Sequence, residues 1–299
     1  MKILLLGKNG QVGWELQRAL QPLGEVIALD RNINANQLCG DISNFAVIQQ
    51  AIEQTQPDVI VNATAYTAVD KAESEPQQAD FINHLAVKHL AEQSQKYGAL
   101  LIHYSTDYVF SGAGETPWRE DDATAPQNVY GQSKRQGELA LVQSGAKFIN
   151  LRTSWVYGTH GNNFIKTMLK LAQSKDELSI IADQIGAPTG AALIADVTAQ
   201  LIRYVQLNPE QQVTGHYHLA ASGECSWFDY ANYIFEQAKQ RGLNLQIQQV
   251  RPIATEAYPT PAKRPRNSRL NTNKLKQQFK LHLPHWQQGV QQVVGEMIS

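Results

Sequence analysis

Tyr130 and Lys134 stand four residues apart, a spacing that on a helix places a phenol and an ammonium on one face. A free phenol has a pKa of about 10 and is a weak proton donor at neutral pH. An ammonium about 4 Å away, at an effective dielectric of about 20, interacts with a phenolate by roughly 4 kcal/mol, or about three pKa units. The pair therefore predicts a general acid, Tyr130, assisted by Lys134. The alternative is an aromatic residue at a helix start and a solvated lysine.

Thr106 and Asp107 follow directly on a strand expected at residues 99–104. Ligands of open α/β sheets bind at the carboxyl ends of the strands. The Thr106 hydroxyl is therefore expected to hold a substrate carbonyl oxygen while Tyr130 delivers a proton to it.

Gly7, Gly10 and Gly13 form a G-x-x-G-x-x-G motif between a strand and a helix. Glycines at this place permit a tight turn, close approach of a pyrophosphate, and close packing of the helix on the sheet. The helix N-terminus then faces the anion with unpaired N–H groups. The motif predicts a dinucleotide site, with a merely tight turn as the alternative.

The end of the next strand carries the residues that would select the cofactor. Asp30 stands where a carboxylate accepts the hydroxyls of the adenosine ribose, which favours NADH. Arg31 could pair with a 2′-phosphate, so NADPH stays open. Asp41 is expected near the adenine, or as the cap of the following helix.

The elements that position these residues alternate between apolar β-type runs and amphipathic helices, which is typical of a parallel sheet covered by helices. Strands are expected at residues 2–6, 25–29, 58–61, 99–104 and 148–151, and helices at 11–20, 44–54, 77–96 and 130–143. The strands are almost continuously apolar, as in a sheet buried on both faces. The pattern predicts an α/β fold with a Rossmann-type doubly wound parallel sheet.

The second half of the chain is richer in glycine and proline. Helices are expected at residues 164–172, 192–205 and 227–240. Residues 251–269 contain four prolines and are expected to form an extended loop: Pro252, Pro259, Pro261 and Pro265. We predict an NAD(P)-binding domain at residues 1–153 and a smaller C-terminal substrate-binding part at 154–299, partly interleaved with it.

Composition narrows the classes of partner. The formal net charge is -1, from 26 basic and 27 acidic residues without a long run of either sign, so neither nucleic acid nor a membrane surface is favoured. No apolar stretch approaches the ~20 residues of a membrane span, and a strand beginning at residue 2 leaves no room for a signal peptide. Cys39 and Cys225 are expected to be buried free thiols. A cytoplasmic protein is expected.

The histidines do not predict a metal site, because none has a partner at metal-ligand spacing. His103 lies within an expected strand and is assigned a structural role, like His84, His89, His216 and His218.

Taken together, the glycine motif and three further segments resemble the extended short-chain dehydrogenase/reductase family. The segments are residues 62–65 (Asn-Ala-Thr-Ala), 105–110 (Ser-Thr-Asp-Tyr-Val-Phe) and 130–134 (Tyr-Gly-Gln-Ser-Lys). Residues 67–73, 152–157, 161–164, 183–189 and 264–270 extend the match over essentially the whole chain. The closer resemblance is to the branch of that family that reduces dTDP-4-dehydrorhamnose.

This resemblance implies hydride transfer from NADH or NADPH to C4 of dTDP-4-dehydro-β-L-rhamnose, giving dTDP-β-L-rhamnose. It implies that Tyr130 is the general acid and that Lys134 binds the nicotinamide ribose and lowers the phenol pKa. The implied cofactor contacts are Gly7, Gly10, Gln11, Val12, Gly13, Asp30, Arg31, Asp41, Ile42, Ala63, Thr64, Ala65, Tyr130 and Lys134. The implied substrate contacts are Val69, Thr106, Asp107, Trp155, Arg264 and Arg266.

Some of these assignments keep an alternative. Trp155, between Ser154 and Val156 at a strand end, is either a substrate contact or plain core. Arg264 and Arg266 are candidates for the substrate diphosphate, since guanidinium groups suit phosphate, or else ordinary surface arginines.

Some bacterial members of the family hold Mg²⁺ with glutamates at a dimer interface. Glu15 and Glu296 match two of those positions, but Ala192 stands at the third. A homodimer is therefore a possible partner state, whereas a metal link is doubtful and the two glutamates are expected to be solvated charges.

Two other functions stay open. A nucleotide-sugar epimerase or dehydratase of the same superfamily also uses a tyrosine–lysine pair, and retains tightly bound NAD. A non-catalytic regulatory subunit with this fold is the other, although an intact set of Thr106, Tyr130 and Lys134 argues against it.

Overall fold

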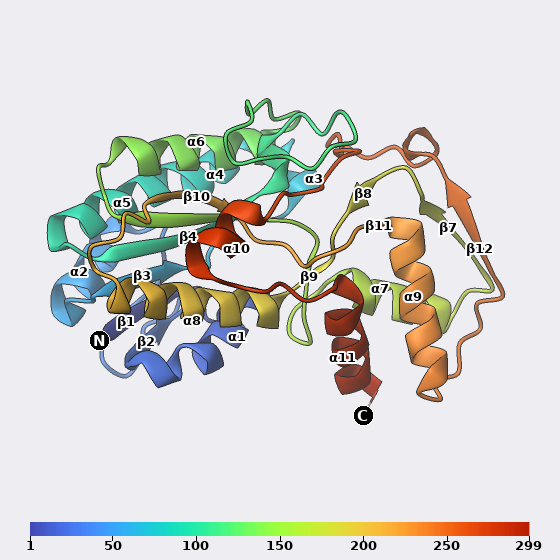
Figure 1. Ribbon diagram of the computed structural model, residues 1–299, viewed down its shortest axis with the longest axis horizontal. Helices are drawn as coiled ribbons and strands as arrows, with labels where there is room; N and C mark the ends of the chain where they lie inside the picture. The colour runs from blue at the N-terminus through green and yellow to red at the C-terminus, as the bar shows by residue number, and fades with distance from the viewer. Residues whose placement is uncertain (299) are drawn as a thin grey trace.

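A sheet of six parallel strands forms the centre of the computed structural model, which describes residues 1–298 (Figure 1). The strand order is β10-β5-β4-β3-β1-β2, with every neighbouring pair parallel. The strands are β1 (Lys2–Leu6), β2 (Glu25–Leu29), β3 (Val59–Asn62), β4 (Leu100–Thr106), β5 (Phe148–Thr153) and β10 (Gly215–His218). The order reverses at β1, which has β2 on one side and β3 on the other.

Both faces of the sheet are buried, because alternate strand residues enter different cores. Ile3 and Leu5 pack into one core, and Leu4 and Leu6 into the other. The first core is closed by α1 (Gln11–Ala19), α8 (Ala191–Leu207) and α10 (Asn273–Phe279). The second is closed by α2 (Phe45–Thr55), α5 (Ala86–Tyr97) and α6 (Val129–Gln143). The predicted doubly wound α/β fold is confirmed.

A third core lies beyond the carboxyl edge of the sheet, on the right in Figure 1. Its helices are α7 (Phe164–Ala172), α9 (Trp227–Gln240) and α11 (Trp286–Ile298). Three two-stranded pairs accompany them: β7 (Glu177–Ile181) with β12 (Gln249–Ile253), β8 (Ile185–Gly186) with β11 (Cys225–Ser226), and β6 (Val156–Tyr157) with β9 (Thr189–Gly190).

Three elements that follow residue 153 in the chain, α8, β10 and α10, pack on the central sheet. The division at residue 153 itself stays a prediction. Among residues 1–298, no helix is long and apolar enough to cross a membrane.

The helix expected at residues 77–96 is interrupted. It consists of α4 (Pro76–Asp80), a π-helical turn (Phe81–Leu85) and α5. Asn83 in the wide turn donates to Tyr66 O and Ser133 Oγ, at 3.0 Å each, and so ties the turn to α6. Apolar periodicity does not encode such a turn, because the hydrogen bonds that accompany it come from distant residues.

The prediction of an extended loop at residues 251–269 is wrong at its start, because residues 251–253 belong to β12. Pro252 is tolerated there since β12 pairs on one side only, with β7, and a strand at an edge can lack one N–H. The shorter helical turns are α3 (Val69–Ala72) and 3-10 turns at Gln21–Leu23, Asp107–Val109 and Thr255–Ala257.

A buried ion pair fixes α6 to β5. Arg152 Nη2 lies 2.7 Å from Glu138 Oε2, and Arg152 Nε donates to Glu138 Oε1 at 2.9 Å. Both side chains are 4% exposed. Burial opposes the Glu138 charge, but Arg152 outweighs burial and lowers the pKa of Glu138. Since α6 also carries Tyr130 and Lys134, this pair helps to position them.

Replacing Arg152 with Met should therefore leave the Glu138 carboxylate buried without its partner. We expect a loss of about 3–5 kcal/mol in the free energy of unfolding, measured by urea denaturation. The matched control is Arg251→Met, which breaks a 2.7 Å ion pair with Glu177 between side chains that are 55% and 41% exposed. That control should cost less than about 1 kcal/mol. Equal losses in the two variants would contradict the role given to burial.

Candidate active site

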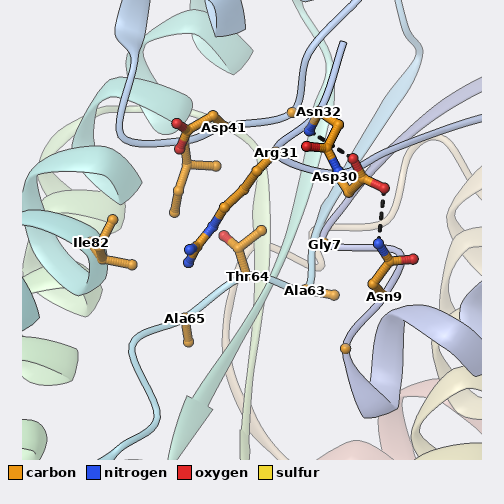
Figure 2. Close-up of a pocket in the computed structure, with 13 residues that line it drawn as sticks. Gly7, Asn9, Asp30, Arg31, Asn32, Asp41, Ala63, Thr64, Ala65 and Ile82 are labelled. Carbon is orange, nitrogen blue, oxygen red and sulfur yellow. Dashed lines mark hydrogen bonds between the residues drawn. The ribbon is translucent and has the colours of Figure 1, made fainter. Parts of the chain in front are cut away.

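A pocket of about 360 Å³ opens at the carboxyl ends of β1, β2 and β3, where the strand order reverses (Figure 2). This is the position at which doubly wound sheets bind ligands. Most residues predicted to hold the cofactor line it: Gly7, Gly10, Asp30, Arg31, Asp41, Ile42, Ala63, Thr64 and Ala65. Of the others, Gln11, Val12 and Gly13 form the first turn of α1, and Tyr130 and Lys134 lie on α6.

The glycine motif has two steric tasks in this structure. Gly7 has φ +87°, and a Cβ on it would lie 2.9 Å from the Ala63 backbone. A Cβ on Gly13 would lie 2.0 Å from Gly7 O, so α1 packs on the turn only because residue 13 is glycine. At Gly10 the nearest atom would be 3.5 Å away, which leaves that side of the turn open.

The first turn of α1 is available to an anion. Gly10 caps the helix without a side-chain hydrogen bond. The first N–H groups of a helix have no partner within it, and the dipole makes this end positive. Together with the space above Gly10, this arrangement fits the pyrophosphate of a dinucleotide.

Asp30 is held by three groups at the pocket rim. Its carboxylate accepts from Asn32 N at 2.7 Å and Asn9 Nδ2 at 2.8 Å, and lies 3.3 Å from Lys8 Nζ. The hydrogen bond from Asn32, with those from Lys8 and Asn9, outweighs burial and lowers the Asp30 pKa. Figure 2 shows the Arg31 side chain extending across the pocket. At this part of the rim the Asp30 carboxylate therefore lies with two cations, Lys8 and Arg31.

Asp41 is not the N-cap of α2, which was the alternative to its cofactor role. The cap is Asn44, whose side chain accepts from Val47 N. The Asp41 carboxylate instead accepts from Ser43 N at 3.0 Å and Ser43 Oγ at 2.7 Å, while its residue lines the pocket.

Lys134 is buried and has two close neighbours on β4. Its Nζ donates to Tyr104 O at 2.7 Å and lies 3.2 Å from His103 Nε2. Burial lowers the pKa of Lys134 to about 8, against the opposing effect of the Glu138 carboxylate. Lys134 therefore loses its charge much more easily than a solvated lysine.

Tyr130 is partly exposed, yet desolvation raises the pKa of its phenol, while a hydrogen bond with Thr106 opposes the rise. The expected lowering of the phenol pKa by Lys134 is therefore wrong for the free protein. Desolvation dominates, and the Lys134 amine is directed at Tyr104 O and His103. A phenol with a raised pKa stays protonated at neutral pH, which is the form required of a proton donor.

Thr106 links the phenol to a second acid. Its hydroxyl acts on the Tyr130 phenol by lowering that group's pKa, accepts from Tyr108 N at 3.2 Å and donates to Asp107 Oδ1 at 3.1 Å. Burial raises the pKa of Asp107 to about 6, against the hydrogen bonds from Ser268 and Thr106. Thr106, Asp107 and Tyr130, a trio of side chains, thus lie together.

Arg264 lies on the same side as this trio. Its Nη2 is 2.6 Å from Asp70 Oδ2, and its Nη1 is 3.4 Å from the Tyr108 hydroxyl. The Tyr108 ring in turn meets the Tyr130 ring edge-on, with centroids 5.6 Å apart. Val69 precedes Asp70 at the start of α3 and so comes to the same region.

Arg266 is directed elsewhere. Its guanidinium pairs with Glu256 and lies 3.5 Å from Asp183, and its side chain is 56% exposed. The structure therefore separates the two arginines that the sequence assigns to one diphosphate.

Trp155 stacks on Trp227, with ring centroids 3.7 Å apart. Its φ of +50° is unusual for a residue with a Cβ. The ring lies against Gly186, where a Cβ would be 2.8 Å from Trp155 Cε2. Packing thus accounts for part of the side chain, and its contact with substrate stays a prediction.

One groove of about 690 Å³ is lined by Glu15, Ala192 and Glu296, and it shares no lining residue with the pocket described above. Glu15 pairs with Arg18 at 3.5 Å, and Glu296 accepts from Gln292 at 2.9 Å. Within residues 1–298, no group of three or more His, Cys, Asp or Glu side chains is arranged to hold a metal ion.

Sequence reasoning missed two polar neighbours of the site, His103 and Asp70. His103 contacts Lys134, and Asp70 pairs with Arg264. The signal for His103 was the presence of a histidine within an otherwise largely apolar run, Leu-Leu-Ile-His-Tyr at residues 100–104. For Asp70 no local signal exists, since its partner is 194 residues away.

The chain is similar to known proteins over its whole length. The family model described as RmlD substrate binding domain matches residues 1–299. A Shigella flexneri protein named dTDP-4-dehydrorhamnose reductase is 54% identical over 299 residues, covering 100% of this chain and 99% of that one. The crystal structure of dTDP-4-dehydrorhamnose reductase from Bacillus anthracis in complex with NADP has a TM-score of 0.88 at 36% identity, covering 99% of each chain.

A more distant likeness shows the fold alone. The structure of Thermus thermophilus UDP-glucose 4-epimerase in complex with NAD has a TM-score of 0.77 at 18% identity, covering 100% of this chain and 99% of that one.

The substitutions Gly10→Ala and Gly13→Ala should separate binding from folding. A Cβ at residue 10 meets no atom closer than 3.5 Å, so stability should change little, while the methyl group occupies space needed by a pyrophosphate. We expect the Kd for NADPH to rise about tenfold or more, measured by fluorescence titration. A Cβ at residue 13 would clash with Gly7 O, and should cost about 1–3 kcal/mol in urea unfolding. Wild-type NADPH affinity in Gly10→Ala would contradict the placement of the pyrophosphate.

Proposed function

The chain belongs to the RmlD substrate binding domain family, and on that basis we propose that it reduces the C4 keto group of dTDP-4-dehydro-β-L-rhamnose to dTDP-β-L-rhamnose. NADH or NADPH is the hydride donor. The observation that carries the proposal is the 54% identity to a dTDP-4-dehydrorhamnose reductase over the whole chain, together with a Thr106–Tyr130 pair at the end of β4, the strand next to β3 of the dinucleotide pocket. The direct test is oxidation of NAD(P)H by the purified chain with dTDP-4-dehydro-6-deoxy-glucose and the upstream 3,5-epimerase.

In this proposal the bound cofactor supplies a hydride to C4. The N-terminal turn of α1 and the open side of Gly10 hold its pyrophosphate. The Thr106 hydroxyl orients the C4 carbonyl, and the protonated Tyr130 phenol gives its proton to the carbonyl oxygen. Hydride on carbon and proton on oxygen together make the C4 hydroxyl. Lys134 holds the nicotinamide ribose.

We place the substrate diphosphate nearer to Arg264 than to Arg266. Arg264 is only 22% exposed and is adjacent to Tyr108, which packs on Tyr130. A forked guanidinium at that place suits a phosphate oxygen. Val69, Asp107 and Trp155 are proposed to contact the sugar nucleotide.

The competing functions have less support. The likeness to epimerases is limited to the fold, at 18% identity. A regulatory subunit would not need a Tyr130 phenol desolvated beside Thr106, because that desolvation costs free energy. An epimerase would retain NAD on purification, so cofactor absorbance in the purified chain would favour that alternative. A homodimer and a cytoplasmic location stay predictions, and sedimentation of the purified chain tests the first.

Tyr130→Phe should lower kcat by about 10²–10⁴-fold, because a positioned general acid contributes that much. Binding of NADPH should stay within about twofold, because the ring remains in place. Steady-state kinetics and fluorescence titration measure the two effects. The control is Tyr97→Phe, which removes a hydroxyl bonded to Glu53 Oε1 at 2.8 Å on the surface. A loss of less than about tenfold in Tyr130→Phe would rule out this acid.

The enzyme should use both NADH and NADPH. Asp30 repels a 2′-phosphate, but Lys8 beside it and Arg31 in the same pocket offset that repulsion. The ratio of kcat/KM for the two cofactors should therefore lie within about a hundredfold. A larger preference for NADPH would mean that Asp30 does not face the ribose.

Arg264→Ala should raise the KM for the dTDP-sugar about tenfold or more, since a charged hydrogen bond contributes about 1.5–3 kcal/mol. Arg266→Ala serves as the matched control from the same loop and should change that KM less than about threefold, because its guanidinium faces Glu256 and Asp183. The Kd for NADPH should be unaffected in both variants. A larger effect from Arg266 would place the diphosphate on the other side of the loop.

A further inference from the structure

His103 is buried in the middle of β4, and both nitrogens of its ring have polar neighbours. Its Nδ1 lies 3.1 Å from Asn62 Nδ2, and its Nε2 lies 3.2 Å from Lys134 Nζ. A neutral imidazole has one N–H and one acceptor nitrogen. The position of that single proton therefore decides what Lys134 meets.

The amide of Asn62 can take only one orientation. Its Oδ1 accepts from Thr64 N at 3.1 Å and from Thr64 Oγ1 at 2.5 Å. A backbone N–H can only donate, so the amide oxygen has to face Thr64. The NH₂ group of Asn62 then faces His103, and it too can only donate.

The tautomer of His103 follows from this orientation. Since Asn62 donates to Nδ1, that nitrogen is the acceptor and the imidazole proton is on Nε2. A doubly protonated ring is opposed, because burial, with the charge of Lys134 and the nearby His216, holds the pKa of His103 well below its ordinary value. The Nε2–H group is therefore directed at Lys134 Nζ.

This contact discriminates between the two forms of Lys134. An ammonium has only N–H groups, so it would set a proton against the Nε2–H of His103. A neutral amine has a lone pair that accepts from Nε2–H while its own N–H donates to Tyr104 O at 2.7 Å.

We propose that Asn62 and His103 form a positioning pair that sets the pH at which Lys134 gains its charge, by holding an imidazole N–H against the amine. The pair acts through Lys134 and touches neither substrate nor cofactor. It connects Thr64, which lines the dinucleotide pocket, to Lys134 through consecutive hydrogen bonds. The inference rests on the proposed function only in the role that Lys134 has there, which is to hold the nicotinamide ribose.

The other titratable groups near Lys134 do not hold an N–H group against its amine. Glu138, on α6, raises the pKa of Lys134, and burial lowers it to about 8. His216, on β10, is neutral at pH 7 because burial lowers its pKa, and its ring contacts Asn150 Nδ2 at 2.8 Å. The Tyr130 phenol is protonated. His103 is thus the group whose proton position distinguishes the amine from the ammonium.

The tautomer can be observed directly in the free protein. Long-range ¹H–¹⁵N correlation spectra of ¹⁵N-histidine-labelled chain distinguish protonated from unprotonated ring nitrogens. The signals that disappear in His103→Gln assign the residue. We expect Nε2 of His103 to be protonated and Nδ1 to be bare near pH 7. A proton on Nδ1 overturns the proposal, and this measurement on the wild type decides even where a variant fails to fold.

The second measurement is the titration of Lys134, followed by NMR of ¹³C-lysine-labelled protein and assigned with Lys134→Met. In His103→Gln a carboxamide oxygen can accept from the ammonium, so the Lys134 midpoint should rise by about one pH unit. The matched control, His216→Gln, makes the same change on β10, which is separated from β4 by β5, and should leave the Lys134 midpoint unchanged. An unchanged midpoint in His103→Gln overturns the proposal.

These experiments use no substrate, so their failure is distinct from failure of the proposed reductase, which the wild-type activity assay tests. In the active enzyme, the alkaline limb of kcat/KM should follow the Lys134 midpoint and move up in His103→Gln by about the same unit. A merely structural role for His103 would lower activity without displacing that limb.

Discussion

Helix α6 has to lie almost in contact with the backbone beside it, and the geometry of the site depends on that approach. A Cβ on Gly131 would lie 2.2 Å from Tyr108 O, and a Cβ on Gly137 would lie 2.2 Å from Asn83 O. Only glycine permits this spacing without a shift of the helix. Tyr130 is next to the first contact, and Lys134 lies between the two along α6. The Glu138–Arg152 pair then fixes the same helix to β5. Close packing thus brings the phenol and the amine to the carboxyl end of β4.

The same packing excludes water and so controls the charges. Burial raises the pKa of Tyr130, lowers that of Lys134 to about 8 and raises that of Asp107 to about 6. Each shift favours the neutral form, because a poorly hydrated surrounding penalises charge. The Tyr130 phenol therefore keeps its proton at neutral pH, as a proton donor to a carbonyl oxygen must. The ion pair of Glu138 and Arg152 keeps its charges because two short hydrogen bonds join them.

The sequence predicts the parts of this site that rest on local patterns. Continuously apolar strands predict a sheet buried on both faces, and Ile3 and Leu4 do pack into different cores. The glycine spacing predicts where the pocket of the sheet lies. Contacts made across the sheet were not predictable. Asn62 and His103 are 41 residues apart and meet only because β3 pairs with β4 in a particular register. The raised pKa of Tyr130 was also missed, since spacing along a helix carries no information about burial.

Arg264 and Arg266 show how the fold overrides a sequence pattern. Residues two apart in an extended chain point to the same side, yet these two guanidinium groups face different carboxylates, Asp70 and Glu256. Pro265 between them packs tightly on Gly112, where a Cβ would lie 2.4 Å from Pro265 Cβ. The chain is thus fixed between the two arginines, and each side chain follows the nearest acid. This pairing has an energetic consequence. A phosphate that binds at Arg264 Nη2 competes with the carboxylate of Asp70, so its affinity depends on an existing ion pair as well as on water.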